Sequence, residues 1–129
     1  MNDVTSRQAV TIMIVDDELF YRQVLRDLLA EEGFTVVAEA ADGAEAVAKF
    51  REMRPKVVIM DIFMPEMNGI EATREIAALD RNASILICSG VGYDDDISAA
   101  LQSGARDILY KPFVASEITE TIDRVTNAG

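Results

Sequence analysis

The segment VTIMIVDDE, residues 10–18, decides the fold class because it joins an unbroken apolar run to three carboxylates. A run in which both alternating rows of side chains are apolar suits a β-strand that is buried on both faces, and such strands belong to parallel sheets. Asp16, Asp17 and Glu18 follow the run directly. Carboxylates that stand this close repel one another, so the segment predicts a positive group, or a turn with free N–H groups, beside them.

Strand-like and helix-like segments alternate along the rest of the chain. Apolar residues at spacings of three and four predict an amphipathic helix after each of five strands. This strict alternation predicts a single α/β domain, a doubly wound (βα)₅ arrangement with helices on both faces of a parallel sheet. The predicted strands, of which the second is the weakest, are 10–15, 34–40, 56–60, 84–88 and 106–110.

Capping residues support several of these helix boundaries. Asp42 and Asn68 each stand three residues before a glutamate, as in a capping box at the start of a helix. Gly33 and Gly104 suit the ends of the first and fourth helices. The signals predict helices that start after residues 42 and 68.

Composition excludes several classes of function. The chain has 129 residues, of which 50% are hydrophobic, enough for one core. Its net charge of −11 opposes binding to nucleic acid. It has no histidine and one cysteine, Cys88, which excludes Ser-His-Asp triads, His/Cys zinc sites and an internal disulfide. No apolar run approaches the ~20 residues of a membrane span, so we expect a cytoplasmic protein without membrane contact. The initial methionine and the end soon after the last helix suggest a full-length product.

Polar residues follow the predicted strands and should meet at one edge of the sheet, because parallel strands end at the same edge. They are Asp16, Asp17, Asp61, Ser89 and Lys111. Crowded carboxylates need a cation, and an all-oxygen set suits Mg²⁺, which often also binds phosphate oxygens. Ser89 and the aspartates are the candidate nucleophiles, and Asp61, alone at its strand end, is favoured to form an aspartyl phosphate. Taken alone, the pair at 16 and 17 also fits simple helix caps.

Four segments together resemble the receiver domain of two-component response regulators. They are IMIVDDE at 12–18, VVIMDIFMPEMNG at 57–69, CSG at 88–90 and YKPF at 110–113. The resemblance spans about residues 10–127, after a polar arm at 1–9, and is closest to stand-alone, CheY-like chemotaxis regulators. It implies the flavodoxin-like fold with strand order 2-1-3-4-5.

The resemblance also implies a role for each site residue. These roles are phosphoacceptor for Asp61, direct Mg²⁺ ligand for Asp17, ligand through water for Asp16, further ligand for the Phe63 carbonyl, phosphoryl contacts for Ser89 and Lys111, and a cis peptide at Pro112.

Three positions set this chain apart within the family. Ile108 stands three residues before the lysine, where receivers usually place a Tyr or Phe that swings inward on activation. Phe63 and Val91 stand two residues beyond Asp61 and Ser89, where fast-hydrolysing receivers tend to place polar side chains that orient the attacking water. The sequence therefore predicts a different readout of phosphorylation and a long-lived phosphoryl group.

The function that the resemblance implies is signalling, with a sensor histidine kinase as donor and Mg²⁺ as cofactor. A downstream protein would bind the surface of the fourth helix, fifth strand and fifth helix, and the domain would catalyse only its own phosphorylation and dephosphorylation. One alternative is a phosphorelay intermediate. A small haloacid-dehalogenase-like phosphatase is disfavoured because that family has a second Asp where this chain has Phe63, and a pseudo-receiver because every site position is filled.

Overall fold

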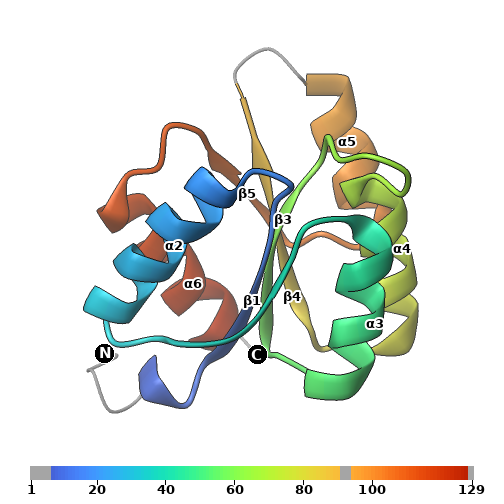
Figure 1. Cartoon of the computed structure of the whole chain (residues 1–129). Helices are drawn as coiled ribbons and strands as arrows, with labels where there is room; N and C mark the ends of the chain where they lie inside the picture. Colours follow the sequence, from blue (N-terminus) through green and yellow to red (C-terminus); the bar gives the residue numbers. More distant parts are fainter. Residues whose placement is uncertain (1–6, 91–93, 128–129) are drawn as a thin grey trace.

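The computed structural model describes residues 7–90 and 94–127, and its centre is a five-stranded parallel sheet (Figure 1). The strand order β2-β1-β3-β4-β5 confirms the predicted topology. The ends of each observed strand lie within one residue of the predicted ends. The strands are β1 (Thr11–Val15), β2 (Thr35–Ala40), β3 (Val57–Asp61), β4 (Ser84–Ser89) and β5 (Asp107–Tyr110).

Five helices connect and follow the strands, as the periodicity predicts. Helices α2 and α6 cover one face of the sheet, and α3, α4 and α5 cover the other (Figure 1). No helix in the described part of the chain is long and apolar enough to cross a membrane. The helices are α2 (Leu19–Glu31), α3 (Gly43–Met53), α4 (Gly69–Leu79), α5 (Asp94–Ser103) and α6 (Ala115–Asn127).

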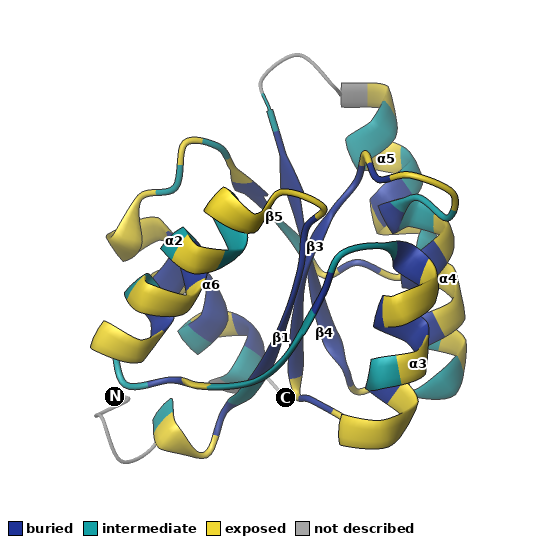
Figure 2. Cartoon of the chain, viewed as in Figure 1, coloured by how far each residue is buried: buried dark blue, intermediate teal, exposed yellow. Residues whose placement is uncertain are grey.

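The core consists of two apolar clusters, one on each face of the sheet. Met13 and Val15 of β1 belong to the cluster under α3, α4 and α5. Ile12 and Ile14 belong to the cluster under α2 and α6. Because alternate side chains of a strand point to opposite faces, a central strand between two helical layers must be apolar at every position. Figure 2 shows the central strands β1, β3 and β4 as almost wholly buried, whereas the edge strands β2 and β5 are mostly not.

The predicted helix caps are present. The Asp42 side chain accepts a hydrogen bond from the N–H of Glu45 at 2.8 Å. Asn68 accepts bonds from two N–H groups in the first turn of α4, each at 3.0 Å. Gly33 and Gly104 have φ values of 90° and 123°, which suit glycine after a helix.

Arg7, near the end of the predicted polar arm, packs against the domain. Arg7 donates to the Glu32 carbonyl at 3.1 Å and to Asp123 Oδ2 at 2.9 Å. Its guanidinium carbon lies 5.2 Å from the centre of the Phe34 ring. Arg7 therefore links Glu32, the residue that follows α2, to α6.

Candidate functional site

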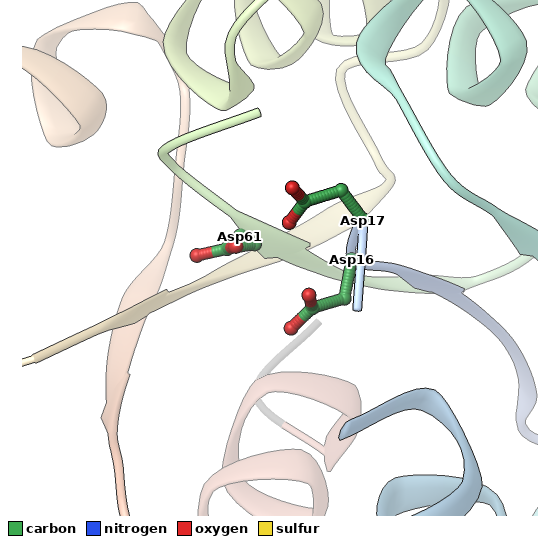
Figure 3. Close-up of side chains that lie close together, drawn as sticks. All are labelled: Asp16, Asp17 and Asp61. Carbon is green, nitrogen blue, oxygen red and sulfur yellow. The ribbon is translucent and has the colours of Figure 1, made fainter. Parts of the chain in front are cut away.

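Three carboxylates meet at the carboxyl end of the central strands. Asp16 and Asp17 follow β1, Asp61 ends β3, and these two strands are neighbours, with Val15 paired to Met60. Each residue offers a carboxylate oxygen within 4.8 Å of the others (Figure 3). Asp16 is 2% exposed and Asp61 9%, whereas Asp17 lies at the surface. The three acids therefore lie together at one edge of the sheet, as expected for residues that follow parallel strands.

Asp16 is held at several atoms, which orders the turn that carries both acids. Its N–H donates to the Ala40 carbonyl at 3.1 Å. Its Oδ1 accepts from the N–H of Glu18 at 2.9 Å, and its own carbonyl accepts from Arg22 Nη1 at 2.6 Å. The contribution of Arg22 was missed in the sequence, where a single arginine in a helix carries no distinguishing signal.

Lys111 supplies the positive group that the crowded acids require. Its Nζ lies 3.2 Å from Asp16 Oδ2 and 3.7 Å from Asp61 Oδ1. Burial lowers the pKa of Lys111, but the negative charges of Asp61 and Asp16 oppose this effect, and the pKa is raised overall. The ammonium group also lies 4.1 Å from the centre of the Tyr21 ring, a cation–π contact. Tyr21 was missed too, although a helix that starts just after the acids returns its first turn to the site.

The charges of the site fit a divalent cation. Burial, together with the negative charges of Asp16 and Asp17, raises the pKa of Asp61 to about 6, because Lys111 only partly opposes these effects. Three carboxylates beside one ammonium group leave two negative charges in excess, which one divalent ion balances. Because every ligand atom is an oxygen, the set suits a hard divalent cation such as Mg²⁺.

The loop between β3 and α4, residues 62–68, folds closely over the end of β3. The N–H of Gly69 donates to the Ile62 carbonyl at 2.7 Å, and a Cβ at position 69 would overlap the Asp61 carbonyl. Glycine is therefore required there. Phe63, whose carbonyl is the predicted further ligand, lies in this loop with 52% of its surface exposed.

Ser89 ends β4 next to β3, where Asp61 pairs with Cys88. It is 3% exposed, and its hydroxyl donates to the Gly90 carbonyl at 3.0 Å. Its own carbonyl accepts from the N–H of Lys111 at 3.0 Å. Cys88 is buried, and burial strongly raises the pKa of its thiol, which suits packing rather than reactivity.

The remaining predicted positions lie around this edge. Ile108 is partly buried and packs against the apolar cluster under α3, α4 and α5. The Lys111–Pro112 peptide bond is cis. Val91 lies outside the described residues.

Comparison with known sequences identifies response regulators as relatives of this chain. The family profile of the response regulator receiver domain matches residues 12–123. The chemotaxis protein CheY of Thermotoga maritima is 44% identical over 115 residues, which are 89% of this chain and 96% of that protein. CheY of Bacillus subtilis is 47% identical over 116 residues, 90% and 97% of the two chains.

Solved structures of response regulators are also similar to this chain. A chain of the CheX–CheY–BeF₃–Mg²⁺ complex from Borrelia burgdorferi superposes with a TM-score of 0.85 at 31% identity, over 90% of this chain and 88% of that one. The response regulator domain of Thermotoga maritima CheB has a TM-score of 0.82 at 36% identity, over 92% and 96%. With its (βα)₅ fold and its acidic cluster beside a lysine, the chain belongs to the family of response regulator receiver domains.

Proposed function

We propose that this receiver accepts a phosphoryl group on Asp61 from a sensor histidine kinase and then changes its binding to a downstream protein in chemotaxis signalling. The observation that carries the proposal is the surroundings of Asp61, an almost buried carboxylate beside two other acids and 3.7 Å from Lys111 Nζ. The chemotaxis role is supported by the 44% and 47% identity to CheY proteins over most of the chain.

In the proposed reaction, a carboxylate oxygen of Asp61 attacks the phosphorus of a phosphohistidine. The new P–O bond forms as the P–N bond breaks, and the electron pair of that bond remains on the imidazole nitrogen. Attack needs an ionised carboxylate, and a pKa of about 6 leaves Asp61 largely ionised at neutral pH. Lys111 would pair with one phosphoryl oxygen, and Ser89, once its hydroxyl turns from the Gly90 carbonyl, would donate to another.

Asp16, Asp17, Asp61 and the Phe63 carbonyl would hold Mg²⁺ beside this group. Bound Mg²⁺ supplies positive charge that stabilises the phosphoryl oxygens during transfer. Two observations support this assignment: the excess of two negative charges in the site, and the presence of Mg²⁺ in the CheX–CheY complex of Borrelia burgdorferi. Asp17, as the exposed acid, is the proposed direct ligand, with Asp16 bound through water.

The proposed output surface is formed by α5, β5 and α6. Leu101 of α5 and Tyr110 of β5 are large apolar side chains that are 44% and 46% exposed. Phosphorylation would shift the population between two arrangements of this surface, and a protein partner would bind one of them more tightly. The net charge of −11 favours a protein partner over nucleic acid.

Incubation with acetyl phosphate and Mg²⁺, followed by intact mass spectrometry, tests the proposal. The wild-type chain should gain one phosphoryl group, and Asp61→Asn should gain none. Glu52→Gln, at an exposed position of α3, is the matched control and should be labelled as wild type. Labelling of Asp61→Asn at the wild-type rate would show that Asp61 is not the acceptor. Rapid onward transfer to a histidine phosphotransfer domain would instead assign the chain to a phosphorelay.

A further inference from the structure

Arg22 of α2 connects the acidic turn to the neighbouring strand β2. Its Nη1 donates to the carbonyl oxygen of Asp16 at 2.6 Å, and its Nε lies 3.3 Å from Glu39 Oε1. Only 16% of the Arg22 side chain is exposed. A guanidinium group can make both contacts at once because its donors form a rigid, planar fork.

The bond to the Asp16 carbonyl has a geometric consequence for Asp17. That carbonyl belongs to the peptide plane that joins the two aspartates, and this plane, together with the φ angle of Asp17, sets the direction in which the Asp17 side chain leaves the backbone. Asp17 lies at the surface, where less packing restrains it. Its aim toward Asp16 and Asp61 therefore depends on the backbone that Arg22 holds.

Glu39 in turn orients Arg22. In the pairing of β1 with β2, Glu39 lies opposite Ile14, two residues before Asp16. Its Oε2 lies 3.1 Å from Arg26 Nη2, and its backbone carbonyl accepts a hydrogen bond from Lys49. The bond from Lys49 of α3 holds the backbone of Glu39, whose Oε1 faces Arg22, while the more exposed Arg26 contacts only the other carboxylate oxygen.

We propose that Arg22, oriented by Glu39, is a positioning residue for the Mg²⁺ site, which it serves by fixing the Asp16–Asp17 peptide. The inference rests on the proposed Mg²⁺ role of Asp17. The charge of Arg22 acts in the opposite direction, because a positive group near the site repels a cation. Positioning therefore predicts weaker Mg²⁺ binding when Arg22 is removed, and charge alone predicts tighter binding.

Arg26 is a matched control for this distinction. It carries the same charge, pairs with the same glutamate and is 46% exposed on the same helix. Arg26 contacts Oε2 of Glu39, whereas Arg22 contacts Oε1 and also bonds to the Asp16 carbonyl.

Calorimetric titration with Mg²⁺ at constant pH and ionic strength tests the proposal. We expect Arg22→Ala to weaken binding about tenfold, the lower range for residues that support metal ligands. Glu39→Gln should weaken it less, and Arg26→Ala should bind as wild type or slightly tighter. If wild type binds Mg²⁺ and Arg22→Ala binds it equally or more tightly, the positioning role of Arg22 is overturned, while the proposed Mg²⁺ site stands. Absence of binding by wild type would overturn the proposed Mg²⁺ site and this inference with it.

A second variant and a metal-free measurement separate positioning from general loss of structure. Arg22→Lys keeps the charge and the aliphatic stem but lacks the two-donor fork, so it should fold and still bind Mg²⁺ more weakly. In metal-free protein, both variants should speed amide exchange at Glu18, whose N–H donates to Asp16 Oδ1 at 2.9 Å. Exchange at Leu86 in the buried strand β4 should stay at the wild-type rate. Equal acceleration at both amides would show general loosening and overturn the proposal.

Discussion

Replacing Asp61 by asparagine should stabilise the metal-free fold at neutral pH, although it removes the proposed phosphoacceptor. Asparagine has nearly the same shape as aspartate but carries no charge. The side chain it replaces is almost buried beside Asp16 and Asp17, and Lys111 offsets their repulsion only in part. Folding therefore places an ionised carboxylate in an unfavourable environment, and the amide avoids that cost.

The size of the effect follows from the pKa of Asp61, which rises from 3.8 to about 6 on folding. At about 1.4 kcal/mol per pH unit, this rise corresponds to about 3 kcal/mol. Water reaches the exposed 12% of the side chain, so we expect about 1–2 kcal/mol after screening. Because the folded pKa is the higher one, the folded state holds the proton more tightly, and stability falls as pH rises from 3.8 to about 6. The gain from Asp61→Asn should be complete above that window and absent below it.

Urea unfolding followed by circular dichroism, with a chelator present, measures this difference. The variant should have the larger free energy of unfolding at pH 7.5, and the two proteins should converge near pH 3.5, below both pKa values. Glu52→Gln removes one charge from an exposed position and should change little. Added Mg²⁺ should stabilise wild type more than the variant. The reasoning would be refuted if the variant had a smaller free energy of unfolding than wild type at pH 7.5. It would also be refuted if the difference between the two proteins were the same at pH 7.5 and at pH 3.5.

Three further outcomes are expected. Asp17→Asn should weaken Mg²⁺ binding in calorimetry more than Asp16→Asn, because the proposed direct ligand is Asp17, and equal losses would contradict that assignment. Ile108 should keep its rotamer in crystal structures with and without a beryllofluoride mimic, because it lacks the aromatic ring that usually swings, and a change of its rotamer between the two structures would contradict this. Phe63→Asn combined with Val91→Glu should speed phosphate release from the purified phosphoprotein about tenfold, or about 1.4 kcal/mol of barrier, because polar side chains can orient the attacking water. An unchanged rate in a folded, Mg²⁺-binding variant would show that these positions do not control hydrolysis.

The sequence alone determined the fold class and most of the site. Local rules sufficed, because strands covered on both faces must be apolar throughout and helices repeat their apolar side chains at spacings of three and four. The common edge of parallel strands then selected Asp16, Asp61 and Lys111 before any contact was known. The order of the strands came from the family motifs, since periodicity does not distinguish one parallel order from another.

Tertiary structure alone decided how these groups are held and charged. Arg7 was assigned to a polar arm, yet it bonds to Asp123 of α6, 116 residues away. Contacts of this kind depend on how each helix is rotated against the sheet, which local spacing does not specify. The same holds for Arg22, whose bond to the Asp16 carbonyl exists because α2 packs with that side toward β2. The pKa of Asp61 likewise depends on burial and on charges from two other segments of the chain, and these arise only when the sheet has formed.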